Sequence, residues 1–538
     1  MIKINNSTVR IISAVAIAIV LTASGLITFF NEESTFDNDS DTEYEIPADD
    51  RRDTVQSDTS FPDVSYPDTS VSSSDASKNA TVSASDLPVN SDVQEEPDVP
   101  AEEKIKIKIV KIKTTANLRA GKSTNSEKIA TLVKGTEWEF IKESGSRYQI
   151  KYSGKKTGWI PISCADLIEK EIIIKHIGKY ISGDPLNLKG TKEGDDVAQF
   201  LKNYGTMGGS VAVIQNGQVA YHYEYGYANS EKKVKVAENT KFRIASVTKV
   251  FTSMLAMSEV DDGKLDLDKS LTEIMGFKFY NPSYSKTPVT TRMLLTHSSG
   301  IKDNDDMFNL KIQNVTHNSN YYCSMPGTGF AYTNLGMGLA GAVVEKVSDQ
   351  TISQYAKDKF FEPMGIDASY DAKYLSDTKL VADCYSGKNI DCSNKYLCRS
   401  QEKGKPGQTF HLGQGGLLIS AEDLASVFTI LLNDGQYNGK QYLSENSVKE
   451  MFTVQPVNTK KNFEQCIGLR KSKNILKNRE MYFHNGAAYG IFSLMAIDPY
   501  DKSGVIVITS GATTPRLKNN LFAVCDDILN YSYEYLIR

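Results

Sequence analysis

The stretch Ser246-Val247-Thr248-Lys249-Val250-Phe251 places a hydroxyl and an amine three residues apart at the start of an apolar run. The apolar residues from Val247 to Leu255 recur with the spacing of one buried helix face. We therefore expect a helix on which Ser246 and Lys249 lie one turn apart. In that position, a neutral lysine amine can take the serine proton while the hydroxyl attacks a carbonyl.

Two further motifs follow in order, Tyr332-Thr333-Asn334 and His484-Asn485-Gly486. The order matters, because the pattern Ser-x-x-Lys starts at six other serines of this chain and means little alone. Taken alone, Ser246 is better explained as an ordinary helix cap, and Tyr332 has a core tyrosine as its alternative. Together, the three motifs favour an active site with a nucleophile, proton carriers and one wall of a cleft.

Residues 195–538 resemble the serine hydrolases that include class C β-lactamases, low-molecular-weight penicillin-binding proteins, and related D-amino-acid esterases and DD-peptidases. Besides the motifs, four segments carry the likeness: Gly209–Gly217, Phe242–Ser246, Thr291–Gly300 and Gly415–Leu424. The resemblance implies an α+β fold, in which an antiparallel sheet flanked by helices adjoins a helical region.

This resemblance also predicts where the elements lie. The sheet is expected to use strands near 209–226 and 480–512. Terminal helices near 195–204 and 516–536 should pack on it. The helical region should carry Ser246 and Tyr332, and the three motifs should meet in the cleft between the two parts.

The resemblance gives each residue of the first two motifs a role. Ser246 would be the nucleophile that forms an acyl-enzyme, and Lys249 the base. Because a free lysine has a pKa near ~10.4, this role requires an environment that depresses the pKa. Tyr332 would relay a proton to the leaving group, and Asn334 would hold the lysine or the substrate.

The third motif departs from the Lys-Thr-Gly pattern of many β-lactamases. His484 replaces the lysine and Asn485 the threonine, which by resemblance points toward D-peptidases and esterases. Gly486 leaves room for substrate, and the backbone N–H of Ala487 would form the oxyanion hole with that of Ser246.

Histidine and cysteine usage indicates no metal site and no cofactor. The chain has six histidines, with no pair at ligand spacing and no Cys-x-x-Cys. His297 and His411 are rivals for a catalytic role, although a scaffold role suits His297 better. Among seven cysteines, Cys384, Cys392 and Cys398 lie close together, and two of them could pair. These three fall in residues 371–410, which resemble the family poorly and look like an inserted loop above the site.

The amino-terminal part predicts a membrane anchor and a tether. Residues 1–10 would be cytoplasmic, and the uncharged apolar run 11–30 is long enough to cross a bilayer. A cleaved signal peptide is the alternative. Residues 31–103 hold 21 acidic residues against three basic ones, which predicts a disordered, Ser/Asp/Pro-rich linker.

Residues 104–167 begin with the alternating Lys-Ile run 104–108, which predicts a strand. Their segments Asn117–Gly121 and Thr157–Ile160, with the Gly135 turn between them, resemble the bacterial SH3-like domain, a small β-barrel often found on wall-active enzymes. The resemblance implies binding to peptidoglycan, although a plain spacer is the alternative. The chain as a whole has a net charge of −5, yet the part after residue 103 carries +11. That charge suits an anionic wall polymer, or it is simply dispersed surface lysine.

These observations predict a membrane-anchored extracellular serine hydrolase that acts on D-amino-acid-containing wall substrates, in the first place a D-Ala-D-Ala carboxypeptidase. The alternatives are an esterase that removes D-alanine from teichoic acid, a class C-like β-lactamase, and a wall-binding protein or β-lactam receptor with an inert hydrolase domain. Export makes nucleic acid an improbable partner.

Overall fold

The computed structural model describes residues 102–537 apart from 154–155, 176–181, 305–311, 313–318, 401, 403–404 and 409–410. The predicted cytoplasmic segment, the anchor 11–30 and nearly all of the linker therefore lie outside the described residues. Among the helices that are described, none is long and apolar enough to cross a membrane.

The first folded part is a seven-stranded antiparallel sheet with its own core. Its strands are β1 (Glu102–Ile112), β2 (Ala116–Arg119), β3 (Lys128–Leu132), β4 (Glu137–Ser144), β5 (Arg147–Ser153), β6 (Lys156–Pro161) and β7 (Ala165–Lys175), in the order β3-β2-β6-β5-β4-β1-β7. Trp138 belongs to this core, and its indole N–H donates to Thr136 Oγ1 over 2.9 Å. Trp159 is also buried, with Lys122 Nζ 4.9 Å from its ring centre. Both tryptophans thus contribute to the barrel's own packing.

The boundaries of this part differ from those predicted. Strand β1 already begins at Glu102, inside the predicted linker, and β7 continues beyond residue 167 to Lys175. The reason is pairing, because β1 and β7 are antiparallel partners along their whole length, from Glu102 opposite Lys175 to Ile112 opposite Ala165.

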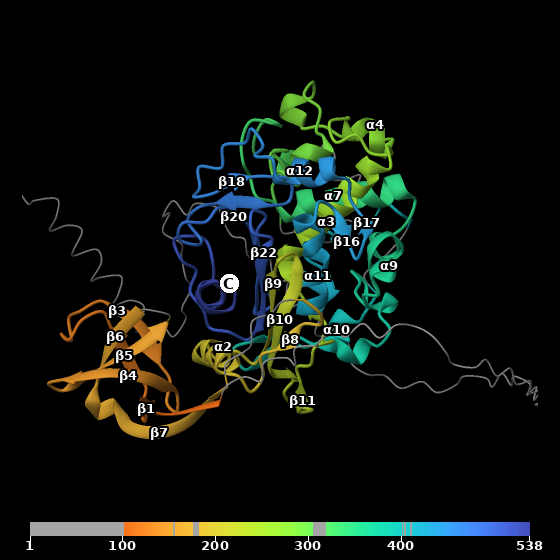
Figure 1. Cartoon of the computed structure of the whole chain (residues 1–538). Helices are drawn as coiled ribbons and strands as arrows, with labels where there is room; N and C mark the ends of the chain where they lie inside the picture. Colours follow the sequence, from red (N-terminus) through yellow and green to blue (C-terminus); the bar gives the residue numbers. More distant parts are fainter. Residues whose placement is uncertain are drawn as a thin grey trace, which may run out of the picture. The chain divides into compact units, whose positions relative to one another are not determined.

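The second sheet has nine strands and draws on both ends of the domain (Figure 1). Its strands are β8 (Leu186–Asn187), β9 (Gly208–Gln215), β10 (Gln218–Asn229), β11 (Val234–Lys235), β18 (Glu464–Gln465), β19 (Arg470–Ser472), β20 (Met481–Ala488), β21 (Ile491–Asp498) and β22 (Ser503–Ser510). The order is β11-β10-β9-β22-β21-β20-β19-β18, and β8 pairs in parallel with β10. The early strand β9 therefore lies beside the late strand β22.

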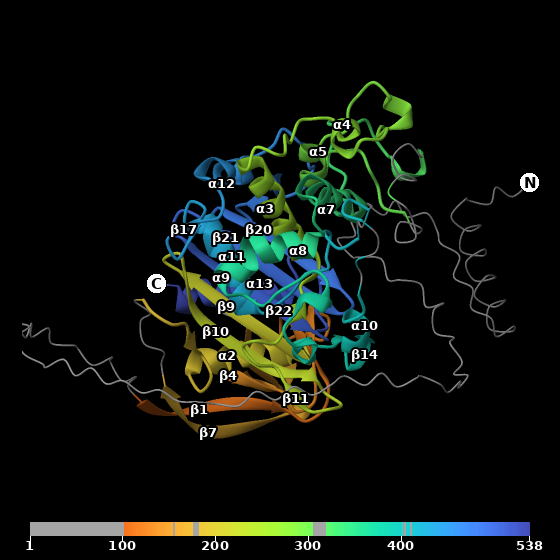
Figure 2. The same ribbon diagram turned by 90° about the vertical axis from the view of Figure 1, so that its right-hand side faces the viewer.

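Helices cover both faces of this sheet, as the α+β prediction requires. Helices α2 (Lys192–Asn203) and α13 (Ala523–Tyr531) share one core with Val211 and Val213, while α11 (Ala421–Leu432) shares another with Ala212 and Ile214. Successive residues of β9 thus face opposite layers, as alternation along a strand dictates. Figure 2 shows the sheet with α11 in front of it.

The helical region is built around α3 (Thr248–Asp261). The other helices are α4 (Leu271–Met275), α5 (Thr291–Leu295), α7 (Asn334–Ser348), α8 (Ile352–Ala356), α9 (Glu362–Met364), α10 (Asn394–Leu397) and α12 (Glu445–Phe452). Three short pairs of strands complete the domain: β12 (Phe242–Arg243) with β15 (Leu418–Ile419), β13 (Cys384–Ser386) with β14 (Asn389–Cys392), and β16 (Gln436–Tyr437) with β17 (Lys440–Gln441).

Helix α3 is more deeply buried than its sequence pattern indicates. The pattern predicts one buried face, but every residue from Thr248 to Glu259 is buried. Two of its hydroxyl side chains bond to backbone acceptors, since Thr252 Oγ1 donates to Gly413 O over 2.7 Å and Ser253 Oγ to Lys249 O over 2.9 Å. The helix that follows Ser246 is therefore held on all sides.

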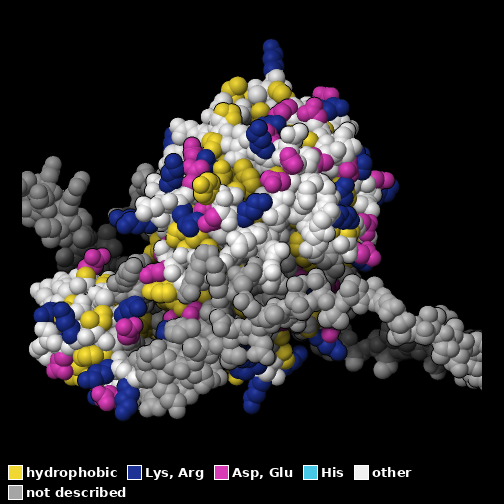
Figure 3. Space-filling model, in the orientation of Figure 1, with side chains coloured by type: hydrophobic (Ala, Val, Ile, Leu, Met, Phe, Trp, Pro, Cys, Tyr) yellow, Lys and Arg dark blue, Asp and Glu magenta, His cyan; other side chains and the backbone are white. Residues whose placement is uncertain are grey.

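Charged side chains are dispersed over the face shown in Figure 3, where Lys and Arg alternate with Asp and Glu. In the barrel, several lysines are offset by acids, as in the pairs Lys113–Asp166 at 2.7 Å and Lys151–Glu139 at 3.4 Å. On that face, this arrangement favours dispersed surface lysine over a binding surface for an anionic polymer as the explanation of the positive charge.

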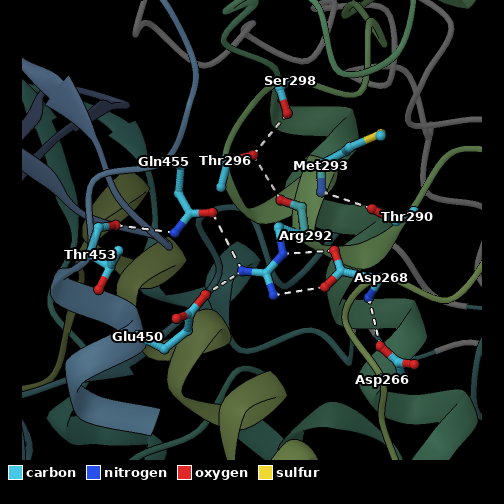
Figure 4. Close-up of polar contacts among 10 residues, drawn as sticks. All are labelled: Asp266, Asp268, Thr290, Arg292, Met293, Thr296, Ser298, Glu450, Thr453 and Gln455. Carbon is cyan, nitrogen blue, oxygen red and sulfur yellow. Dashed lines mark hydrogen bonds and ion pairs between the residues drawn. The ribbon is translucent and has the colours of Figure 1, made fainter. Parts of the chain in front are cut away.

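Arg292 links α5 to α12 and to the loop before α4 (Figure 4). Its Nε and Nη2 donate to the two carboxylate oxygens of Asp268 over 2.7 and 2.9 Å, and its Nη1 donates to Glu450. The hydrogen bonds from Arg292 hold the pKa of Asp268 below its ordinary value. Helix α5 directly precedes His297, so the paired hydrogen bonds from Arg292 to Asp268 fix one side of the helical region.

We predict that Arg292→Lys lowers the free energy of unfolding by roughly 1–2 kcal/mol, because lysine keeps the charge but cannot form the two-pronged bond to Asp268. Urea denaturation followed by circular dichroism measures this change. As a control, Lys269→Ala removes a neighbouring exposed pair with Glu273 and should change the value by less than about 0.5 kcal/mol. Identical midpoints for Arg292→Lys and the unmodified protein would contradict the prediction.

Candidate active site

Ser246 lies in a short 3-10 turn, Ala245–Val247, directly before α3, and its side chain is buried. Ala245 has a φ of 48°, a left-handed conformation that costs a non-glycine residue about 1 kcal/mol or more. The backbone of Ile244 is held from two sides. Its N–H donates to Leu417 O over 3.1 Å, and its carbonyl accepts from Ser493 Oγ over 2.7 Å.

Lys249 is fully buried, and its amine nitrogen lies within hydrogen-bond distance of three oxygen atoms. Nζ lies 2.8 Å from Ser246 Oγ, 2.8 Å from Asn334 Oδ1 and 2.6 Å from the carbonyl of Gln414. These acceptors come from the nucleophile turn, the start of α7 and the loop before β15. The predicted neighbourhood of Ser246 and Lys249 is thus present as a direct hydrogen bond.

Tyr332 supplies a second polar group at the nucleophile. Its hydroxyl donates to Ser246 Oγ over 2.9 Å, so amine and phenol both contact the same oxygen. Two basic side chains lie near its ring, since Lys249 Nζ is 5.1 Å and Arg470 Cζ 5.2 Å from the ring centre. Tyr332 itself lies in the loop just before α7 rather than in a helix.

The second motif is held by Asp303, which sequence reasoning missed. One carboxylate oxygen accepts from Thr333 Oγ1 over 2.7 Å and from Leu335 N over 2.9 Å. The other accepts from the backbone and side-chain amides of Asn334, both over 3.1 Å. Because the Asn334 Nδ2 is thereby engaged, its Oδ1 is directed at Lys249. The acidic group also suits the amino-terminal end of α7.

The third motif lies on β20, which passes directly along the nucleophile turn. A Cβ added at Gly486 would come within 2.8 Å of Ser246 N, 2.8 Å of Ile244 O and 2.5 Å of Ser493 Oγ. Any larger residue would push the strand away from the serine, so glycine is required for this approach. Ala487 follows it on the strand and is buried.

His484 and Asn485 lie at the same wall and are buried. His484 Nδ1 lies 2.8 Å from the carbonyl oxygen of Asn485, and its ring centre lies 6.3 Å from that of Tyr332. Asn485 Oδ1 accepts from Nη1 of Arg470 over 3.0 Å. Arg470 is itself buried and also packs on the ring of Phe463, so a fixed cation stands beside the cleft.

His297 belongs to the support of the site. Its Nδ1 accepts from the backbone N–H of Thr333 over 3.3 Å, and its ring lies 4.4 Å from that of Tyr332. An imidazole held in this way positions the second motif, in line with the scaffold role expected for it.

The structure therefore brings Ser246, Lys249, Tyr332 and Asn334 into one hydrogen-bonded group and sets the third-motif strand against it. Asp303, Gln414 and Arg470 were missed by sequence reasoning. Gln414 contributes only a backbone carbonyl, which no residue type signals, whereas Asp303 and Arg470 are single charged residues outside any motif.

The inserted region 371–410 contains ordered elements where a loop was expected. Strands β13 and β14 form a hairpin, followed by α10. The hairpin packs against the turn between β20 and β21, because a Cβ at Gly490 would lie 1.8 Å from Tyr385 O. Whether this region selects substrate stays a prediction.

One group among the described residues could hold a metal ion, although the sequence gave no sign of it. Ligand atoms of His222, Glu238 and Glu422 lie within 4.8 Å of one another. His222 Nδ1 lies 2.7 Å from Glu224 Oε1. The three residues come from β10, the loop before β12 and the first turn of α11, so no sequence spacing joins them.

Comparison with known proteins agrees with this geometry. Residues 195–524 match the family model described as Beta-lactamase, so the chain belongs to the beta-lactamase family, whose members are typically serine hydrolases. Residues 114–165 match the bacterial SH3 domain.

Particular relatives are similar over parts of the chain. Protein flp of Staphylococcus aureus is 23% identical over 333 residues, which cover 58% of this chain and 62% of that relative. The chain thus spans less than two thirds of that relative's length. A beta-lactamase of Providencia stuartii is 30% identical over 211 residues, covering 37% of this chain and 51% of that protein. The solved octameric penicillin-binding protein homologue from Pyrococcus abyssi is 25% identical, with a TM-score of 0.49 over 60% of this chain and 74% of that one.

We predict that Asp303→Asn slows covalent labelling of Ser246 by a fluorophosphonate roughly 10- to 100-fold. The amide replaces one of the two accepting oxygens by an N–H donor, so either Thr333 and Leu335 or both N–H groups of Asn334 lose their acceptor, and the second motif shifts away from the serine. Labelling is followed by intact-protein mass spectrometry. The control, Asp184→Asn, changes an exposed residue and should label at the unmodified rate. An unchanged rate for Asp303→Asn would remove Asp303 from the site.

A second prediction concerns pH. Burial and the neighbouring Glu238 raise the pKa of Glu422 to about 7, although His222 opposes this. Burial lowers the pKa of His222, but Glu224 outweighs it, so that pKa is raised too. Both groups hold protons more tightly when folded, so each contributes stability below its unfolded pKa. The contribution of Glu422 is lost as pH rises to about 7, and that of His222 as pH rises through its own raised pKa.

Glu422→Gln should therefore flatten the decline in the free energy of unfolding between pH 5 and 7, in urea titrations at both values. Glu231→Gln, at an exposed turn, serves as the control and should leave the decline unchanged. If both variants follow the unmodified protein, the Glu422 carboxyl does not titrate in this range.

Proposed function

We propose that this protein is a membrane-anchored extracellular serine hydrolase that forms an acyl-enzyme at Ser246, acting as a D-Ala-D-Ala carboxypeptidase on cell-wall peptides. The observation that carries the proposal is the pair of contacts at Ser246 Oγ, from Lys249 at 2.8 Å and Tyr332 at 2.9 Å. Both groups can exchange a proton with the reacting oxygen within hydrogen-bond reach.

The acylation step follows from this arrangement. Ser246 Oγ forms a bond to the substrate carbonyl carbon, and its proton passes to neutral Lys249. The oxyanion is held by the backbone N–H groups of Ser246 and Ala487. When the carbon–nitrogen bond breaks, Tyr332 gives its proton to the departing amine of the terminal D-alanine and regains one from Lys249. Water then attacks the ester by the reverse path and releases the acid.

Arg470 supports a substrate with a free carboxylate. Its guanidinium is buried, hydrogen-bonds Asn485, and lies 5.2 Å from the Tyr332 ring centre. A fixed cation beside the group that protonates the leaving amine suits an anionic leaving group, and a terminal D-alanine is one. When a D-alanyl ester of teichoic acid is cleaved, the leaving group is instead an uncharged hydroxyl of the polymer.

The rest of the chain supports action at the cell wall. The bacterial SH3 domain would bind peptidoglycan, with residues 11–30 as the membrane anchor and 31–103 as the tether that spans the distance to the wall. An anchored enzyme on a long tether suits a substrate polymer that does not itself diffuse.

The test uses the full chain and three substrates: a peptide ending in D-Ala-D-Ala, the same peptide amidated at its carboxyl end, and D-alanylated teichoic acid. We expect release of D-alanine from the first, and a loss of at least about 1000-fold in Ser246→Ala. In Arg470→Gln, kcat/KM should fall roughly 10- to 100-fold on the free peptide only, because the amide never used the cation.

Other outcomes would replace the proposal. D-alanine released from teichoic acid alone would identify an esterase, and rapid turnover of a chromogenic cephalosporin a β-lactamase. A stable β-lactam adduct on Ser246 without any turnover would identify a receptor. With no adduct and no product, the hydrolase domain would be inert, leaving a wall-binding protein.

A further inference from the structure

Two cysteines face each other across the β13–β14 hairpin. Cys384 and Cys392 are direct partners in the antiparallel register of these strands. Directly opposite residues of such a pair have Cβ atoms about 4.5–5.5 Å apart. That spacing requires only a small adjustment to reach a disulfide, whose Cβ atoms lie about 3.5–4.5 Å apart. Both cysteines are free thiols in the structure.

Their surroundings separate this pair from the other thiols. Cys384 is 1% exposed and Cys392 5%, so both sulfur atoms are enclosed within the hairpin. Cys398, the third cysteine of the region, donates to the carbonyl of Thr378 instead. Cys466 likewise donates to the carbonyl of Phe452. The fold thus selects one pair among the alternatives that the sequence left open.

We propose that Cys384 and Cys392 form a disulfide when the chain folds in the presence of a thiol oxidant of the disulfide class, such as oxidised glutathione. The thiolate of Cys392 attacks one sulfur of the oxidant and expels one glutathione thiolate, giving a mixed disulfide. Cys384 then loses its proton and attacks the Cys392 sulfur, expelling the second glutathione. Two protein thiols are oxidised, one disulfide of the oxidant is reduced to two thiols, and both protons pass to the departing thiolates.

The acid–base order of the pair supports this sequence of attack. The hydrogen bond from Cys384, aided by the charge of Arg243, lowers the pKa of the Cys392 thiol. The same contact and burial raise the pKa of Cys384. Cys392 is therefore the thiol that reacts first, and Cys384 the one that resolves the mixed disulfide.

The bond would fasten a hairpin that backs the third-motif strand. The backbone N–H of Tyr385 donates to Ser510 Oγ over 2.9 Å, and its hydroxyl accepts from Ser230 N over 2.7 Å. Gly490, in the turn after β20, lies directly against the carbonyl of Tyr385. A two-stranded hairpin is marginal by itself, so a covalent link adds to these few contacts.

Peptide mapping of the full chain tests the proposal. The reduced protein is unfolded, refolded in a glutathione redox buffer, alkylated and cut with trypsin without reduction. Lys388 lies between the two cysteines, so cleavage there leaves peptides 380–388 and 389–395 joined only by the predicted bond. We expect this joined pair in the unmodified protein and in Cys398→Ser, and its loss in Cys384→Ser.

Thermal unfolding provides the second readout. Adding reductant to the oxidised protein should lower the unfolding midpoint by several degrees in the unmodified chain and in Cys398→Ser, and leave Cys384→Ser unchanged. The proposal is overturned if 389–395 is instead joined to 396–399, which holds Cys398, or if Cys384 and Cys392 are both recovered alkylated at every glutathione ratio.

Discussion

The buried amine of Lys249 is the constraint on which the catalytic half depends. A lysine amine removed from water needs hydrogen-bonding partners. Here they come from Ser246, Asn334 and the carbonyl of Gln414, three points widely separated in the chain. Three segments must therefore come together around Lys249: the nucleophile turn, the start of α7 and the loop before β15. The packing around them holds these segments in contact.

A second requirement comes from the sheet. The wall opposite Lys249 is β20, a strand from late in the chain that is placed by its neighbours β21 and β22, while β22 pairs with the early strand β9. Gly486 then lets β20 approach the backbone of Ser246 without a side chain between them. The nucleophile turn and the third-motif strand thus meet through elements that come from interleaved parts of the sequence.

Local patterns predicted single elements and the closeness of Ser246 to Lys249, and the family resemblance supplied the rest of the polar core of the site. The apolar spacing after Ser246 predicts a helix, and alternation along 104–108 predicts a strand, because both depend on neighbours in sequence. What depends on distant contacts was not predictable. The Gln414 carbonyl has no residue signature, Asp303 acts through the backbone of another segment, and the β1–β7 pairing sets boundaries that composition alone misplaced. The group of His222, Glu238 and Glu422 needed three separate elements to come together.

The contact between Gly413 and Gly341 has a consequence for how sequence variation in this protein is interpreted. A Cβ at Gly413 would lie 3.1 Å from the Cα of Gly341, so α7 and the loop that carries Gln414 touch backbone to backbone. An alanine at either glycine would change no charge and no hydrogen-bonding group, yet it would separate the loop from the helix and draw the carbonyl away from Lys249. Natural variants at these two glycines should therefore be grouped with active-site variants in a search for inactive alleles, although neither position carries a reactive side chain.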